Sequence, residues 1–276
     1  MALIELTLQS RVLSGTTTVW VSIPEETGGD RQRFGQGLYQ PGVTYQTLWL
    51  LHGGGDDCSC WFRYTNVERY ANERKLIVVC PSAYLSCYAD MHYGPKYYTW
   101  VTEELPQILR WMLPISPRRE DNFVAGLSMG GYGALKWAFN QPERFAAVGT
   151  FCGAVDMPAI IRANHMKDGV VTDNNFVLAF GDDKAVEHNE ADALYMAEQQ
   201  HAAGVALPRI FCSVGSQDFT YRFNAGMRER FAAAGIDMTW DEHPGGHEWG
   251  YWDGAVLRFM DWAGLKRAPI IDKEVR

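Results

Sequence analysis

The sequence has no long apolar run and no basic cluster. Its apolar stretches, such as Leu76–Val79, are far shorter than the ~20 residues that cross a bilayer, and Glu5 interrupts the N-terminus where a signal peptide needs apolar residues. Acidic residues outnumber basic ones by 33 to 25, and the basic residues form no group larger than Arg118-Arg119. We therefore expect a cytoplasmic protein that binds a small molecule rather than nucleic acid or a membrane, with a homo-oligomer left open.

The six cysteines lack the spacing of a metal or redox site. Cys58 and Cys60 are too close for the usual C-x-x-C pattern, and no second pair completes a zinc site, so we expect no bound metal. For these two thiols we expect packing, with redox sensitivity as the alternative. Like them, Cys87 lies in polar, loop-like sequence. The others lie in apolar runs, where a thiol packs as a small hydrophobe: Cys80, Cys152 and Cys212.

Hydrophobic patterning predicts an α/β protein. Alternating apolar residues at 4–8 and 19–23 indicate two antiparallel N-terminal strands. Short apolar runs then alternate with helix-like segments, which predicts a mainly parallel sheet with helices on both faces. The runs expected as strands are Leu48–Leu51, Leu76–Cys80, Phe123–Leu127, Ala146–Phe151, Ile210–Val214 and Met238–Glu242. The expected helices are Trp61–Asn72, Thr99–Met112, Met129–Asn140, Asn189–Ala203, Tyr221–Ala234 and Trp249–Ala263.

The 276 residues contain no Ser/Pro-rich linker or internal repeat, and a content of 47% hydrophobic and 21% charged residues suits a globular core. Residues 156–183 show no clear periodicity. We expect a single domain over residues 1–276, with a cap-like insertion at about 156–205 over the edge of the sheet.

Ser128 is the candidate nucleophile, because Gly126–Gly130 fits G-x-S-x-G between an expected strand and an expected helix. At such an elbow the serine is exposed at the carboxyl end of the sheet, and the helix N-terminus faces a developing anion. A serine hydroxyl needs a base to become a nucleophile. The order serine, acid, histidine removes His52 and His92, and an exposed polar role is expected for His165, His188 and His201. The preferred base is therefore His247, in the loop after the last strand, with His243 as the fallback.

The acid must orient the imidazole. Asp218 follows the buried strand at 210–214 and precedes the histidine loop, so it is the preferred acid. The rivals are Asp156, Asp182 and Asp183, for which helix capping or loop solvation is the simpler interpretation.

An oxyanion hole is predicted from the HGGG-type loop that begins at His52. The backbone N–H groups of Met129 and Gly54 are the expected donors, with Gly53 a near rival of Gly54. For His52 itself we expect a structural role. No Lys-Ser or Lys-Thr follows the glycines, so phosphate binding is excluded and no cofactor is expected.

Six separated motifs are shared with one known family: Leu50–Gly53 (LLHG), Gly94–Thr99 (GPKYYT), Glu103–Pro106 (EELP), Gly126–Lys136 (GLSMGGYGALK), Pro142–Ala146 (PERFA) and Gly246–Trp249 (GHEW). Through them, nearly the whole chain resembles the esterase D family of α/β-hydrolases, most closely its bacterial tributyrin esterase branch with acetyl and feruloyl esterases. One departure is Gly54-Gly55, where the branch often carries a larger residue after His-Gly.

The resemblance implies a serine carboxylesterase for short acyl esters, including acetylated sugars and hydroxycinnamoyl or feruloyl esters, with Ser128, His247 and Asp218 as its triad. The alternatives are a thioesterase similar to S-formylglutathione hydrolase, an acyltransferase and a non-catalytic binding module, although a module would be expected to lack a triad residue. Gly53, Tyr97 and Trp249 are candidates for the substrate pocket. The aromatic residues at 84–100 could line a pocket, but packing in the core or at a subunit interface is the preferred interpretation.

Overall fold

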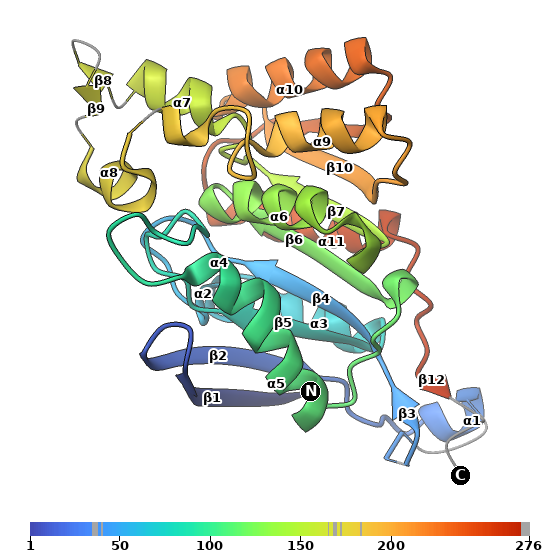
Figure 1. The fold of residues 1–276 in the computed structure, drawn as a ribbon. Helices are drawn as coiled ribbons and strands as arrows, with labels where there is room; N and C mark the ends of the chain where they lie inside the picture. The colour runs from blue at the N-terminus through green and yellow to red at the C-terminus, as the bar shows by residue number, and fades with distance from the viewer. Residues whose placement is uncertain are drawn as a thin grey trace.

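A computed structural model describes residues 1–34, 38–39, 41–164, 166–167, 170–171, 173–182 and 184–271 (Figure 1). Its centre is one eight-stranded sheet in the order β1-β2-β5-β4-β6-β7-β10-β11. The strands are β1 (Ala2–Ser10), β2 (Gly15–Ile23), β4 (Gln46–Leu51), β5 (Leu76–Pro81), β6 (Asn122–Leu127), β7 (Ala147–Phe151), β10 (Arg209–Gly215) and β11 (Thr239–His243).

The N-terminal hairpin is antiparallel and the rest of the sheet is parallel. β1 pairs with β2, and β2 pairs antiparallel with β5. From β5 to β11 every pairing is parallel. The inner strands are buried along their whole length, as continuous apolar runs predict for strands covered on both faces. The expected fold class, an α/β-hydrolase fold with antiparallel N-terminal strands, is confirmed.

Helices cover both faces of the sheet. In Figure 1, α5 and α6 lie in front of it, and α3 and α11 lie behind. Two apolar clusters result, one beneath α5, α6, α9 and α10, the other beneath α2, α3 and α11. The main helices are α2 (Cys60–Tyr64), α3 (Val67–Glu73), α5 (Leu105–Met112), α6 (Met129–Asn140), α9 (Ala193–Ala202), α10 (Tyr221–Ala234) and α11 (Trp249–Trp262).

The remaining described elements are short: α1 (Asp30–Phe34), β3 (Val43–Thr44), α4 (Tyr97–Thr99), a π-helical turn (Trp100–Glu104), α7 (Met157–Asn164), β8 (Met166–Lys167), β9 (Val170–Val171), α8 (Asn174–Phe180), β12 (Ile270–Ile271) and 3₁₀ turns at Arg119–Asp121, Pro142–Arg144 and Lys184–Val186. β3 pairs with β12, and β8 pairs with β9.

Two helix predictions were wrong in their bounds. The expected helix Trp61–Asn72 is divided into α2 and α3, because the Asn66 N–H donates to Asp253 Oδ1 at 2.8 Å and turns the chain there. The expected helix Asn189–Ala203 begins four residues late, at Ala193. Its start is fixed by Asp192, whose side chain accepts from the Tyr195 N–H at 3.1 Å.

The expected insertion at 156–205 follows β7 and contains α7, α8 and α9. Residues 165, 168, 169, 172 and 183 of that interval lie outside the described residues. α8 is joined to the loop before α4 by backbone bonds from His92 N to Ala179 O and from Tyr93 N to Leu178 O, both 2.9 Å. α9 packs against α6, the helix that follows Ser128.

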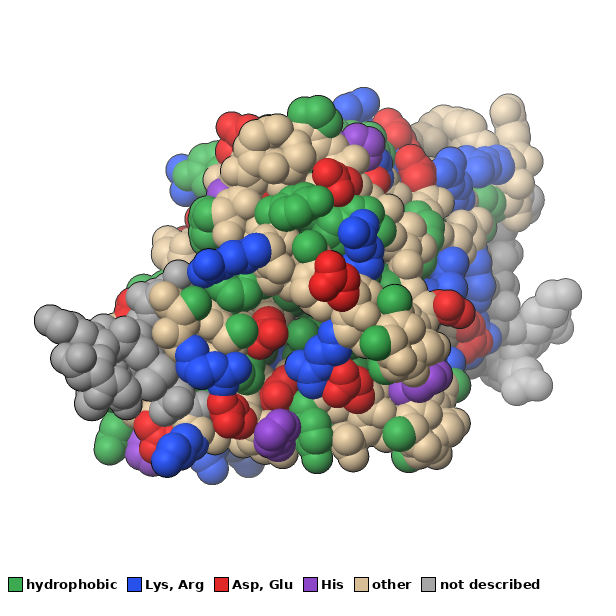
Figure 2. All heavy atoms as spheres, turned by 90° about the horizontal axis from the view of Figure 1, so that it is seen from above, with side chains coloured by type: hydrophobic (Ala, Val, Ile, Leu, Met, Phe, Trp, Pro, Cys, Tyr) green, Lys and Arg blue, Asp and Glu red, His purple; other side chains and the backbone are tan. Residues whose placement is uncertain are grey.

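Membrane-spanning helices and surface charge bear on the expected partners, and burial bears on the expected role of the cysteines. Among the described residues no helix is long and apolar enough to span a membrane. On the face shown in Figure 2, acidic and basic side chains are interspersed. All six cysteines are buried and none forms a disulfide. Cys58 and Cys87 lie in turns, as their polar surroundings predicted, whereas Cys60 begins α2.

Candidate active site

Ser128 lies at a sharp turn between β6 and α6, with φ 51° and ψ −119°. Glycines on both sides make this turn possible. A Cβ at Gly126 would lie 2.3 Å from Gly130 O, and a Cβ at Gly130 would lie 2.4 Å from Leu51 O. Both contacts are with backbone, so neither can be relieved by a side-chain movement. The glycines of G-x-S-x-G are therefore required by close packing of the elbow against β4.

Three side chains from separate strand ends form a hydrogen-bonded chain. His247 Nε2 lies 2.9 Å from Ser128 Oγ, and His247 Nδ1 lies 2.9 Å from Asp218 Oδ2. Ser128 follows β6, Asp218 follows β10, and His247 follows β11. The carboxyl ends of parallel strands share one edge of the sheet, so residues 119 positions apart meet there. This arrangement can move a proton from the hydroxyl to the imidazole, with the carboxylate orienting the ring.

Asp218 is held by several donors. Its Oδ1 accepts from the Thr220 N–H and from Thr220 Oγ1, both at 2.7 Å. Burial raises the pKa of Asp218, but hydrogen bonds from His247, Cys152 and Thr220 outweigh burial and lower it. The carboxylate is therefore charged at neutral pH and able to stabilise an imidazolium.

Two aromatic rings lie against the imidazole of His247. The Phe219 ring centroid lies 4.4 Å from the imidazole at an interplanar angle of 45°, and the Trp252 ring lies edge-on at 4.9 Å. Trp252 is buried, whereas Phe219 is 70% exposed. The imidazole thus packs against one buried ring and one exposed apolar ring.

The glycine loop after β4 lies directly against the nucleophile. A Cβ at Gly53 would lie 3.5 Å from Ser128 Cβ, whereas one at Gly54 would face Leu85 instead. Met129 is the first residue of α6, where helix N–H groups have no intrahelical acceptor. The glycine loop and the start of α6 therefore both lie beside Ser128.

His52 fixes the glycine loop. Its Nε2 accepts from the Ala83 N–H at 2.9 Å, which leaves Nδ1 to donate to Gly53 O at 2.7 Å. Burial lowers the pKa of His52 to about 4, so the ring is neutral at pH 7. The Tyr88 hydroxyl donates to the backbone oxygen of His52 at 3.0 Å. His52 therefore occupies the structural position expected for it.

The rival residues are engaged elsewhere. His243 Nε2 lies 3.0 Å from Asp241 Oδ1. Asp156 accepts from the Ala159 N–H at 3.0 Å and Asp182 from the Ala185 N–H at 2.9 Å, which are the capping roles considered for them. Asp183 lies outside the described residues.

The structure brings Gly53 to Ser128 but gives the other two pocket candidates different neighbours. The centroid of the Tyr97 ring lies 6.0 Å from that of the Tyr84 ring. Trp249 contacts the rings of Trp61, Tyr64 and Trp252.

Sequence reasoning missed Phe219, Leu85 and Cys152 at the site. The available signal for Phe219 was its position directly after the acid, in an otherwise polar turn. Cys152, Asp218 and His247 also form the one group among the described residues whose donor atoms lie close enough to hold a metal, within 4.8 Å of one another. A metal there would displace the proton shared by the imidazole and the carboxylate, so the hydrogen-bonded chain and a bound metal are mutually exclusive.

Comparisons with known proteins agree with this geometry. An acetyl esterase of Caldicellulosiruptor saccharolyticus is 24% identical over 264 residues, which cover 95% of this chain and 98% of that protein. A substrate-bound fluorophosphonate-binding serine hydrolase of Staphylococcus aureus has 30% identity and a TM-score of 0.83, and an S-formylglutathione hydrolase of the same organism has 30% identity and a TM-score of 0.81. Both structural matches cover 95% of this chain and 98% of the other.

The Esterase family model matches residues 31–260, an interval that contains the elbow, the acid and the histidine loop. The resemblance to esterase D enzymes is therefore confirmed. The chain belongs to the Esterase family, as a carboxylic ester hydrolase with the α/β-hydrolase fold.

Proposed function

We propose that the protein hydrolyses short-chain acyl esters through an acyl-enzyme on Ser128. The observation that carries this proposal is the unbroken chain from Asp218 through His247 to Ser128, with both links at 2.9 Å. Ser128 Oγ attacks the ester carbonyl while His247 Nε2 takes its proton. The imidazolium then gives that proton to the leaving oxygen, and water activated by the same base releases the acid.

The oxyanion of each tetrahedral intermediate is held by backbone N–H groups. Met129 supplies one donor, and Gly54 or Gly53 supplies the second. Loss of a donor of this kind typically slows acyl transfer by ~10²–10³-fold. The approach of Gly53 to the Ser128 side chain supports this placement.

The substrate class is supported by the relatives. The acetyl esterase aligned along almost the whole chain favours acetyl esters. Acetylated sugars are included among them because of the sequence motifs shared with the acetyl and feruloyl esterase branch. The S-formylglutathione hydrolase structure at 30% identity supports thioester hydrolysis as the second candidate. Hydroxycinnamoyl esters, including feruloyl esters, and acyl transfer to an alcohol complete the set to be tested.

The experiment has a chemical arm and a substrate arm. A fluorophosphonate should modify the wild-type protein at Ser128, seen as a mass increase on the peptide that carries it, and Ser128→Ala should remain unmodified. Initial rates on p-nitrophenyl acetate, acetyl-xylose, methyl ferulate and S-formylglutathione then rank the substrates, and product analysis with added alcohol detects transfer. Full ester hydrolysis by Ser128→Ala would show that the nucleophile is another residue.

A further inference from the structure

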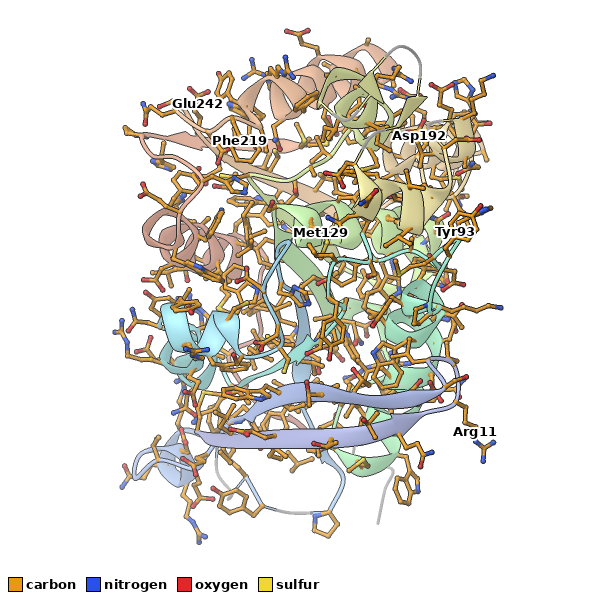
Figure 3. All side chains as sticks on the ribbon, turned by 90° about the vertical axis from the view of Figure 1, so that its left-hand side faces the viewer. Arg11, Tyr93, Met129, Asp192, Phe219 and Glu242 are labelled. Atoms are coloured by element: carbon orange, nitrogen blue, oxygen red, sulfur yellow. The ribbon has the colours of Figure 1, made fainter. Side chains whose placement is uncertain are left out.

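Phe219 is a large apolar side chain exposed to solvent at the edge of the sheet where Ser128, Asp218 and His247 meet. Single exposed hydrophobic residues are common on protein surfaces, so exposure alone indicates nothing. Its position is informative, because the ring that is 70% exposed also lies 4.4 Å from the imidazole that faces Ser128. Figure 3 labels it together with Met129, which begins the helix behind the nucleophile.

The turn that carries Phe219 is fixed on both sides. The Asp218 N–H donates to Gly215 O at 3.0 Å, and the Tyr221 N–H donates to Asp218 O at 3.0 Å. Between them the Thr220 N–H donates to Asp218 Oδ1 at 2.7 Å. The backbone at Phe219 therefore cannot rotate its side chain into the core without breaking the bonds that hold the triad acid.

The reaction gives the space beside His247 a defined occupant. The imidazole that takes the serine proton must hand it to the departing oxygen, so the leaving alcohol lies next to His247 Nε2. The oxyanion, by contrast, faces the glycine loop and Met129. The Phe219 ring lies 4.4 Å from this same imidazole, which must reach the leaving oxygen.

We propose that Phe219 is a specificity-determining residue that favours esters of aryl alcohols over esters of small aliphatic alcohols. Its ring carries no hydrogen-bonding group, so it recognises a leaving group through apolar contact. A flat aromatic ring can pack on it in an offset or edge-to-face arrangement, whereas a methyl or ethyl group covers little of it. The proposal rests on the proposed function and adds to it the class of alcohol released.

The test uses two esters that share an acyl group. Phenyl acetate and methyl acetate both acylate the enzyme with acetate and differ only in the alcohol. For Phe219→Ala we expect kcat/KM to fall about 3- to 10-fold on phenyl acetate, the range of a lost aromatic pair, and to stay within about twofold on methyl acetate. Trp111→Ala is the matched control, because Trp111 is 87% exposed on α5, away from the triad, and should leave both values unchanged.

A second measurement separates leaving-group recognition from support of the imidazole. Both esters form the same acetyl-enzyme, whose hydrolysis no longer involves the alcohol, so Phe219→Ala should hydrolyse it at the wild-type rate in single-turnover experiments. An equal loss on both esters, or slower release of acetate, would overturn the proposal and assign Phe219 to positioning His247. Unchanged kcat/KM on phenyl acetate would overturn it too. Failure of the proposed function looks different, since Ser128→Ala would then remain active on both esters.

Discussion

The residues beside Ser128 tolerate almost no added volume. In Gly126→Ala the new Cβ would lie 2.3 Å from Gly130 O, and only a movement of β6 or α6 relieves that overlap. We expect the substitution to lower the free energy of unfolding by about 1–3 kcal/mol or more, as overpacking of a core does, and to reduce the yield of active protein. Thermal unfolding measured by calorimetry would show it.

The matched control is Gly250→Ala in the first turn of α11. No atom lies within 4 Å of its added Cβ, and alanine favours a helix over glycine by about 0.5–1 kcal/mol. This variant should unfold at or slightly above the wild-type temperature. If both variants behaved alike, the close packing of the elbow would not be what requires glycine at 126.

The role of Cys152 can be tested separately from the packing of the elbow. Its thiol hydrogen-bonds to Asp218 and contributes to the lowered pKa of that carboxyl. Cys152→Ala removes the donor, so the pKa of Asp218 rises and the acidic limb of the kcat/KM profile moves to higher pH. We expect a loss of less than about tenfold at the optimum, because a thiol is a weak donor. Cys152→Ser keeps a donor and should keep the wild-type limb. Identical profiles for both variants would show that the thiol only fills space.

The three side chains that form the hydrogen-bonded chain could be picked out from the sequence, because a nucleophile, acid and base of this kind leave a pattern in the chain. A nucleophile elbow has a fixed spacing of glycines, and acid and histidine follow in a fixed order after predicted strands. Phe219 and Cys152 carry no such pattern. The role of Phe219 depends on the direction in which its turn points the ring, and that of Cys152 depends on the end of β7 lying beside Asp218. Local spacing in the sequence predicts neither.

At the scale of elements, strands and helices with strong local signals were predicted almost to the residue. α6 and α10 have the expected bounds. The failure at Trp61–Asn72 has a tertiary cause, since the group that divides this helix is Asp253, 187 positions away from Asn66. Local propensity favours one helix there, and a distant carboxylate overrides it.

Removal of that carboxylate should therefore loosen the junction of α2 and α3. Asp253 accepts from Asn66 N, from Asn66 Nδ2 and from the Tyr70 hydroxyl at 2.8, 3.2 and 3.0 Å. We expect Asp253→Ala to lower the free energy of unfolding in urea by about 1–3 kcal/mol, because three donors lose a charged acceptor. Asp237→Ala, which changes an exposed aspartate, should be neutral. Equal stability of the two variants would contradict the role given to Asp253.

Across the whole molecule, one sheet brings the site together from distant parts of the chain. The glycine loop with Gly53 lies in the first quarter of the chain, and His247, the proposed base, lies near its end. Parallel pairing of the central strands follows from their continuous apolar runs and the helices between them, which the sequence shows. The conformation of the insertion cannot be predicted from the sequence, because residues 156–183 have no periodicity from which packing could be inferred.

His52 is buried at the start of the glycine loop, so we expect the free energy of unfolding of the whole fold to depend on pH between 6.5 and about 4. Folding lowers the pKa of His52 from 6.5 to about 4, so between these values the unfolded chain binds a proton that the native protein does not. Stability must then fall as pH falls from 6.5 to 4, by roughly 3 kcal/mol at about 1.36 kcal/mol per pKa unit. Folding also lowers the pKa of several carboxyls, and these act at lower pH than His52. The stabilisation from Asp30, Asp57, Asp121 and Asp218 is present above pH 3.8 and is lost only below it, and that from Glu26 is lost below pH 4.5.

The unfolding free energy measured in urea at a series of pH values separates these windows. His52→Gln should be less stable than the wild type at pH 7, because the bonds to Ala83 and Gly53 are changed, yet its stability should be nearly flat from pH 6.5 to 4. His201→Gln, at an exposed position on α9, should retain the wild-type slope. The slope rather than the level is diagnostic, since a purely structural loss lowers stability equally at every pH. A wild-type slope in His52→Gln would mean that another group takes up the proton on unfolding.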